Sequence, residues 1–116
     1  MGLRAESNSP NELLAMACEM NRALQIHTLV IHPVSYALAV SSNDAEIIEG
    51  PFIPKPVITT GAGDHFNSGF CLGKLLGFDN AMSVLTGVTT SGYYVRTAQS
   101  PTIRQLTEMM QNWPSK

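Results

Sequence analysis

Thr59–Phe70 reads TTGAGDHFNSGF, and this stretch decides how the rest of the sequence is interpreted. It leads from an apolar, proline-flanked segment into a predicted helix. Gly61 and Gly63 leave the backbone nearly bare, so that a ligand can approach it closely. The N–H groups in the first turn of a helix have no partner within the helix, and they carry the positive end of its dipole. Together these features predict a pocket for phosphate or another oxyanion.

An aspartate, Asp64, stands at the mouth of the predicted pocket. The dipole that attracts an anion also favours a carboxylate at this position. A carboxylate beside an anion pocket suggests a base that acts on a substrate next to phosphate. Phosphoryl transfer needs such a group to orient or deprotonate the nucleophile, together with positioning and electrostatic stabilisation. The neighbouring His65 is expected to point away around the helix. A capped helix after a glycine turn explains the same residues without any chemistry, and composition alone does not separate the two interpretations.

Most of this stretch, Thr60–Phe70, resembles the C-terminal signature of the ribokinase/PfkB carbohydrate kinase family. Weaker similarity continues over 81–101, where the family has a helix that lines the adenine site. The resemblance implies that Asp64 takes the proton from the acceptor hydroxyl. It also implies that the backbone amides of three residues form the anion hole for the transferred phosphoryl group: Gly61, Ala62 and Gly63.

The fold implied by this resemblance is α/β, a Rossmann-like three-layer arrangement of the ribokinase type, present as its C-terminal portion only. Residues 1–116 are interpreted as a single domain, the nucleotide-binding and catalytic part of such a kinase. The implied reaction is ATP-dependent phosphorylation of a sugar or nucleoside hydroxyl, with Mg²⁺ accompanying the nucleotide. Further nucleotide contacts are expected at three positions: Thr60, Asn67 and Gly87.

An alternative from another class is a non-catalytic fragment or degenerate relative that binds nucleotide or a protein partner. Ile58 stands where the family usually has an aspartate associated with a monovalent cation, so the sequence offers such a cation no carboxylate here. His32–Tyr36 replaces a glycine-containing turn that helps to hold nucleotide, and Gly87 replaces a common asparagine. These departures, with the missing sugar-binding half, favour the alternative, whereas the intact glycines and Asp64 favour the kinase.

Composition argues against several other functions. The 116 residues carry a net charge of −2 without a basic run, so nucleic-acid binding has no electrostatic support. No apolar stretch reaches the length of a membrane span, and the N-terminus lacks the pattern of a signal peptide. Cys18 and Cys71 are expected to be buried free thiols, as in a cytoplasmic protein. No metal site is expected, because the three histidines lack the spacing of metal ligands. The sequence neither predicts nor excludes a homodimer.

The N-terminal half is expected to form one helix and three strands. Ser9–Glu12 has the pattern of a capping box with proline at the first helical position, and the helix continues to about Gln25. An apolar, buried strand is expected over 27–32 and a second strand over 36–40. A third is expected over 46–49, whose charged ends suit the edge of a sheet.

The C-terminal half is expected to be helical. Gly69, Gly73 and Gly77 recur at four-residue spacing. Three glycines on one face predict close packing of this helix, with Gly77 also at its C-terminal cap. A second helix begins near Asp79, and tertiary burial has to stabilise its threonines, which are poor helix formers. Thr102 opens a last helix with a capping box. The apolar stripe of this helix comprises Ile103, Leu106, Met110 and Trp113.

Overall fold

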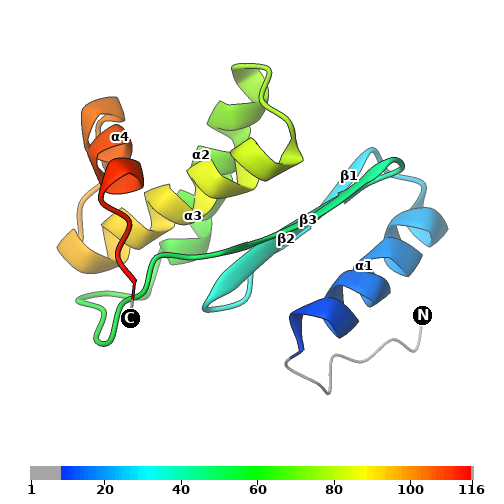
Figure 1. Cartoon of the computed structure of the whole chain (residues 1–116), viewed down its shortest axis with the longest axis horizontal. Helices are drawn as coiled ribbons and strands as arrows, with labels where there is room; N and C mark the ends of the chain where they lie inside the picture. Colours follow the sequence, from blue (N-terminus) through cyan, green and yellow to red (C-terminus); the bar gives the residue numbers. More distant parts are fainter. Residues whose placement is uncertain (1–8, 116) are drawn as a thin grey trace.

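The computed structural model describes residues 9–115, which form a three-layer α/β unit (Figure 1). The helices are α1 (Pro10–Leu24), α2 (Ala62–Leu75), α3 (Asn80–Thr97) and α4 (Ile103–Gln111), and the strands are β1 (Thr28–Ile31), β2 (Tyr36–Ser41) and β3 (Asp44–Glu49). The sheet lies in the middle, with α1 on one face and the pair α2–α3 on the other, while α4 packs on α3. The expected α/β three-layer arrangement is therefore confirmed.

The sheet is an antiparallel meander in the order β1-β2-β3. Residues 42–43 form the turn between Ser41 and its partner Asp44, so that β3 begins two residues earlier than the charge pattern predicts. β3 lies at a sheet edge, as expected. The expectation of a buried strand over 27–32 is wrong, since all four residues of β1 are only half-buried. β1 is the other edge of the described sheet, and α1 covers only one of its faces.

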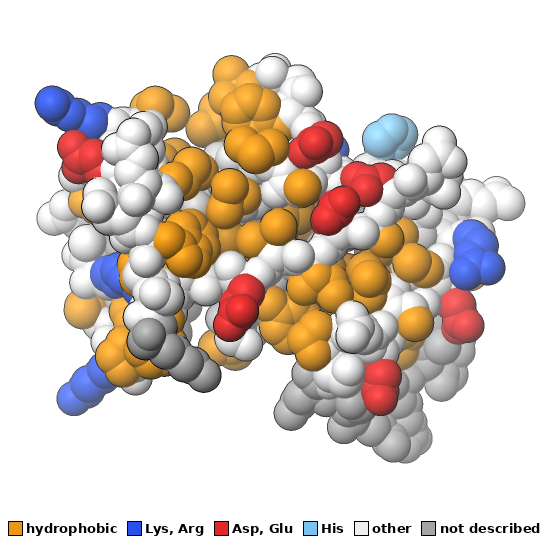
Figure 2. All heavy atoms as spheres, viewed as in Figure 1, with side chains coloured by type: hydrophobic (Ala, Val, Ile, Leu, Met, Phe, Trp, Pro, Cys, Tyr) orange, Lys and Arg blue, Asp and Glu red, His pale blue; other side chains and the backbone are white. Residues whose placement is uncertain are grey.

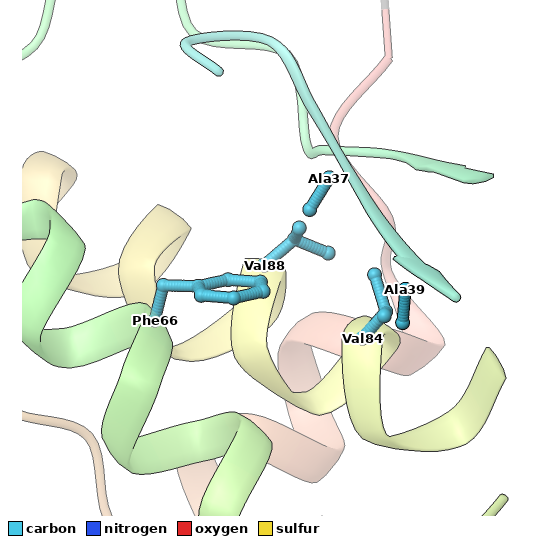
Figure 3. Packing of buried hydrophobic residues seen from close by; sticks show 5 residues of the cluster. All are labelled: Ala37, Ala39, Phe66, Val84 and Val88. Carbon is cyan, nitrogen blue, oxygen red and sulfur yellow. The ribbon is translucent and has the colours of Figure 1, made fainter. Parts of the chain in front are cut away.

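Alternate residues of β2 face the two helical layers and build two separate cores. Ala37 and Ala39 face α2 and α3, whereas Leu38 and Val40 face α1. The first core is completed by three buried residues of α2 and α3: Phe66, Val84 and Val88 (Figure 3). The second is completed by two buried residues of α1: Leu13 and Ala17. β2 is thus the element that joins all three layers.

α1 begins at Pro10 as expected, but its capping box does not form. Pro10 occupies the first helical position and Ser9 is the N-cap residue, yet the Ser9 side chain makes no capping hydrogen bond. The backbone still starts the helix, because the N–H of Leu13 donates to the Ser9 carbonyl at 3.1 Å. The residue types of a capping box therefore locate the helix start even though the side-chain bond of the box is not made.

Two glycines let α2 lie close against α3. A Cβ atom at Gly69 would come within 2.7 Å of a backbone carbonyl oxygen of α3, and one at Gly73 would stand 2.8 Å from the Ser83 Cα atom. Gly77 differs, since a side chain there would meet nothing within 4 Å. Its φ of +81° and the hydrogen bond from the Phe78 N–H to the Gly73 carbonyl (2.9 Å) form a Schellman cap. The expected packing therefore holds for two glycines, and the third ends the helix.

α3 is buried along most of its length, which explains its threonines. Thr86, Thr89 and Thr90 are buried, and each donates its hydroxyl to the backbone carbonyl one turn earlier. Asp79 caps the helix start by accepting from the Met82 N–H at 2.9 Å. The expectation that tertiary burial stabilises this helix is confirmed.

The capping box of Thr102 and Gln105 at the start of α4 forms as predicted. The apolar stripe of this helix is only partly buried. Leu106 is buried, but Ile103, one turn earlier, is 64% exposed. The sequence pattern gave Ile103 and Leu106 the same role because they share a face, whereas of these two only Leu106 is buried.

Both cysteines are free, but the expectation that both are buried is wrong. Cys18 is half-buried in α1, and Cys71 is exposed on α2. On an α-helix a residue two positions away points about 200° around the axis. Cys71 is therefore turned away from the side on which Gly69 and Gly73 meet α3.

Figure 2 shows one face of the molecule, where hydrophobic side chains gather across the middle with Asp and Glu side chains between them. Apolar surface is thus continuous over part of this face. Within residues 9–115, no helix combines the length and the apolar character needed to cross a membrane.

Candidate functional site

The loop before α2 is a tight turn built around Gly61. The N–H of Ala62 donates to the Thr59 carbonyl at 3.1 Å, and Gly61 has φ +92° and ψ −2°. These angles belong to the third residue of a type II turn, where glycine is favoured. Tyr94 of α3 adds a second reason, since a Cβ atom at Gly61 would stand 3.0 Å from its hydroxyl oxygen. The fold itself therefore requires Gly61.

The first turn of α2 has unpaired N–H groups. Among residues 9–115, no group accepts a hydrogen bond from the N–H of Gly63 or Asp64. A Cβ atom at Gly63 would meet nothing within 4 Å, so the space beside it is open. Of the trio Gly61, Ala62 and Gly63 predicted to form the anion hole, the N–H of Ala62 is already used by the turn itself. The N–H groups of Gly61, Gly63 and Asp64 are the ones left without a partner among residues 9–115, and they are the donors suited to an oxyanion.

Asp64 is the third residue of α2, and it is exposed. In the part of the chain that the structure describes, its carboxylate has no hydrogen-bond or ion-pair partner, and Ser68 binds only its backbone carbonyl, at 3.0 Å. The carboxylate is therefore free to meet a hydroxyl group that arrives from solvent.

A pocket of about 330 Å³ opens beside the turn. Ala62 and Gly63 contribute to its lining, so the pocket reaches the start of α2. The wall formed by α3 is apolar or small: Val88, Ser91, Gly92 and Val95. An apolar pocket that ends at free backbone N–H groups suits a ligand with an apolar part and an anionic part.

The segment His32–Tyr36 lines the same pocket. The ring of His32 stacks on Phe66, with the ring centroids 4.1 Å apart and the planes at 19°. Burial lowers the pKa of His32 from its ordinary value of 6.5, because the charged form loses solvation. His32 thus contributes to this lining an uncharged ring that is packed on Phe66.

Three positions expected to contact nucleotide are not in the pocket lining. Thr60 is exposed, and its carbonyl accepts from the Tyr94 hydroxyl at 2.7 Å. Asn67 is exposed on α2. Gly87 is buried, and a Cβ atom there would stand 2.6 Å from the Phe66 ring, so that packing explains its missing side chain.

Sequence reasoning missed the residues that hold the turn in place. His65 Nδ1 lies 2.9 Å from the Gly61 carbonyl oxygen, and the His65 ring stacks on Tyr94 at 3.8 Å between centroids. The Tyr94 hydroxyl donates to the Thr60 carbonyl. No local pattern links Tyr94 to Thr60, because they are 34 positions apart and only the packing of α2 on α3 brings them together.

Metal-ligating side chains are sparse around the turn. Within residues 9–115, no three or more His, Cys, Asp or Glu side chains gather as a metal-ion site. Asp64 is the acidic side chain in the first turn of α2.

The model of the prokaryotic ketohexokinase family matches residues 3–113. A curated ketohexokinase from Haloferax volcanii is 35% identical to this chain over 75 residues, which are 65% of this chain and 20% of that protein. The chain therefore spans about a fifth of the length of this curated relative.

Solved structures agree with the family match at the level of the fold. Phosphofructokinase-2 from Escherichia coli has a TM-score of 0.75 at 18% identity, over 91% of this chain and 35% of that chain. Ribokinase from Thermotoga maritima has a TM-score of 0.70 at 20% identity, over 89% and 40%. A nucleoside kinase from Methanocaldococcus jannaschii has a TM-score of 0.70 at 19% identity, over 90% and 33%.

At these identities the likeness to solved structures shows the fold alone, and the part present is a fraction of the ribokinase-type fold. The family model, by contrast, spans nearly the whole sequence and includes the turn before α2. The chain therefore belongs to the prokaryotic ketohexokinase family, within the ribokinase/PfkB carbohydrate kinases.

Proposed function

We propose that this chain is the nucleotide-binding and catalytic part of an ATP-dependent ketohexose kinase. The observation that carries the proposal is the start of α2, where the unpaired N–H groups of Gly63 and Asp64 lie beside the pocket. Family membership supports a carbohydrate kinase. The name of the Haloferax volcanii relative supports a ketohexose as the acceptor, in preference to a nucleoside.

The pocket beside α3 is the nucleotide site of this proposal. The apolar wall formed by Val88, Gly92 and Val95 suits a base, and the free N–H groups at the start of α2 suit the phosphates. Pro33 in the pocket lining has no N–H to donate, and phosphate binding is assigned to the free N–H groups at the start of α2. Mg²⁺ fits as a companion of the phosphates, since it commonly binds through one or two carboxylates together with phosphate oxygens and water. Within residues 9–115 no cluster of acidic side chains stands ready for the ion, so phosphate oxygens and water would hold most of it, and Asp64 is assigned the role of base.

Bound ATP with Mg²⁺ supplies the γ-phosphoryl group. Asp64 takes the proton of the acceptor hydroxyl as the hydroxyl oxygen bonds to the γ-phosphorus and the bond from that phosphorus to ADP breaks. The N–H groups of Gly63 and Asp64 donate to phosphoryl oxygens that carry charge in the transition state. These donors are fixed by the helix before the ligand arrives, so they need no reorganisation during the reaction.

A segment exchange tests this function. This chain replaces the matching segment of the Haloferax volcanii ketohexokinase, and ADP release is followed with ATP, Mg²⁺ and a panel of ketohexoses. The chimera is expected to phosphorylate a ketohexose. In the Asp64→Asn chimera, turnover is expected to fall about 10²- to 10⁴-fold, the usual contribution of a general base. The affinity for ATP should stay close to that of the parent chimera, because backbone N–H groups hold the phosphates.

The matched control is Glu108→Gln, which makes the same acid-to-amide change at an exposed position of α4 outside the pocket lining and should leave turnover within about twofold of the parent. A chimera that binds ATP but releases no ADP with any ketohexose contradicts the proposal. An Asp64→Asn chimera with parental turnover contradicts the role of Asp64 alone.

A second candidate is a non-catalytic chain that binds nucleotide or a protein partner. Several large apolar side chains are more than half exposed, and exposed apolar surface marks interaction sites when it is contiguous. They include Val34 (104%), Leu75 (85%), Val57 (70%) and Leu76 (59%). A homodimer would cover such surface, and sedimentation analysis of the chain over a range of concentrations tests for it.

A further inference from the structure

We propose that Tyr94 and His65 are positioning residues that lock the two peptide groups on either side of Gly61 and thereby fix the direction of the Gly61 N–H and the start of α2, where phosphate binds. The inference rests on the proposed function, because it assigns the N–H groups there to a phosphoryl ligand. Neither side chain needs to touch the ligand. Both act through the backbone of the turn.

Tyr94 fixes the peptide group between Thr60 and Gly61. Its hydroxyl donates to the Thr60 carbonyl at 2.7 Å, and its ring covers the place where a Cβ atom of Gly61 would lie. In a trans peptide the C=O and N–H bonds point in opposite directions. Holding the Thr60 carbonyl towards Tyr94 therefore directs the Gly61 N–H away from α3, and this N–H has no partner among residues 9–115.

His65 fixes the next peptide group, between Gly61 and Ala62. The Gly61 carbonyl accepts from the backbone N–H of His65 at 3.1 Å and lies 2.9 Å from His65 Nδ1. A carbonyl oxygen only accepts hydrogen bonds, so Nδ1 carries the proton. The N–H of Ala62 is held on the other side by the Thr59 carbonyl. This peptide group is thus bonded at both ends.

The two side chains also hold each other. Their rings are stacked at 3.8 Å between centroids with an angle of 11° between the planes. His65 Nε2 lies 2.8 Å from the Ser100 hydroxyl oxygen, in the connection between α3 and α4. The stack therefore ties the start of α2 to the end of α3 and to the segment that follows it.

We call the contacts of Tyr94 and His65 with the Thr60 and Gly61 carbonyls the clamp, and a glycine turn needs such contacts. Gly61 has no Cβ atom to restrict its backbone, so its peptide groups can rotate between turn types at little steric cost. Each rotation would misdirect the N–H groups on which the phosphate depends. Donors that are fixed before the ligand arrives bind it without paying for their own ordering.

The experiment follows the backbone N–H signals of the full chain by NMR while inorganic phosphate is added. In the parent chain, the signals of Gly61, Gly63 and Asp64 are expected to shift with phosphate. Tyr94→Phe removes one hydroxyl and keeps the stack, and His65→Phe removes the ring donor and keeps an aromatic ring. Each is expected to raise the dissociation constant of phosphate about three- to tenfold, the effect of one lost hydrogen bond.

Two further variants separate positioning from a general loss of structure. His65→Gln restores a side-chain N–H within reach of the carbonyl one turn earlier, and it should recover most of the affinity. Tyr93→Phe makes the same change as Tyr94→Phe at the next position of α3, where Tyr93 lies beside Arg96 and Met109 and its hydroxyl does not reach the turn. It should bind phosphate as the parent does. Melting curves of every variant accompany the titrations.

The outcomes are distinct. If Tyr94→Phe and His65→Phe bind phosphate as tightly as the parent, the positioning role is wrong, whatever their melting temperatures. The anion site is not affected by this outcome. If the N–H signals at the start of α2 in the parent chain do not shift with phosphate, the anion site is wrong. The positioning role of Tyr94 and His65 is then wrong as well. If His65→Phe does not fold, Tyr94→Phe decides, because it removes a single oxygen atom.

Discussion

Different neighbours explain the residue types found at and around the start of α2. Gly61 is required by its φ of +92° and by the hydroxyl of Tyr94, and Gly87 is required by the ring of Phe66. Asp64 has no such neighbour in the described part of the chain, and nothing there constrains its side chain. Folding therefore explains the two glycines, whereas Asp64 is explained by the helix dipole, which favours a carboxylate in the first turn, and by the role of base that the proposed function gives it.

Lowering the pH is expected to destabilise the fold through His32. Burial lowers the pKa of this imidazole below its ordinary 6.5, so the unfolded chain binds a proton more readily than the folded chain. No penalty arises above about pH 6.5, and the penalty grows as the pH falls from there towards the pKa of the folded state. The thermal midpoint should therefore fall more between pH 7 and pH 5 in the natural chain than in His32→Phe.

His32→Phe is the matched variant because a phenyl ring keeps the stacking on Phe66 and cannot titrate. His27 and His65 are present in both proteins, so the comparison isolates His32. Parallel pH dependence of the two midpoints would show that His32 is solvated in the folded chain.

At the scale of elements, the close approach of α2 and α3 controls both stability and the site. Gly69 and Gly73 bring the backbones together. The same packing brings Tyr94 of α3 to the turn before α2, where its hydroxyl bonds to Thr60. A change that pushes the two helices apart therefore acts on the core and on the turn together.

Gly73→Leu is expected to destabilise the chain by about 1–3 kcal/mol or more, because overpacking forces the backbone to move. The first added carbon would stand 2.8 Å from the Ser83 Cα atom, which has no rotamer with which to give way. Thermal melting measures the effect. Cys71→Leu, at an exposed position of the same helix, is the control and should melt close to the parent. Equal midpoints for both variants would mean that the helices can separate at no cost.

Local sequence patterns predicted the helices and strands. The half-burial of β1 and the role of Tyr94 could not be predicted, because they depend on contacts between residues far apart in the sequence. Thr102 and Gly77 perform the capping roles that their residue types indicate, because capping depends on a few neighbouring backbone groups. Ser9 has the same pattern of residue types, but its side chain makes no capping bond. The half-burial of β1 depends on which strands lie beside it. Tyr94 could not be assigned to the turn, because its partner is far away in sequence.

The whole molecule covers part of a larger architecture. It spans 20% of the Haloferax volcanii ketohexokinase and 35% of Escherichia coli phosphofructokinase-2. The face in Figure 2 has hydrophobic side chains gathered across its middle. Val57 and Leu75 are among the side chains with most of their surface exposed. Apolar surface of this kind is what the remainder of a kinase fold would cover.

The 116-residue chain alone is therefore expected to bind phosphate-containing ligands weakly and to phosphorylate nothing. The turn and the start of α2 are local, and they can hold an oxyanion without the remainder of a kinase. Under the proposed function, transfer also needs the acceptor hydroxyl held in line beside Asp64. Such positioning lowers the activation barrier by several kcal/mol. Calorimetry with ATP and Mg²⁺ measures binding, and a coupled assay measures ADP release. Sugar-dependent ADP release by the isolated chain would show that it is a complete enzyme.

Gly63 allows selection for folding to be distinguished from selection for catalysis. It lies in the first turn of a regular helix, and a side chain there would meet no atom of the protein within 4 Å. In a mutant library screened only for a folded chain, position 63 should accept many residues while Gly61 and Gly73 stay fixed. Under the proposed function, a library screened for phosphoryl transfer should return glycine at 63 as well. A lineage that abandons catalysis is therefore expected to lose Gly63 first and to keep Gly61.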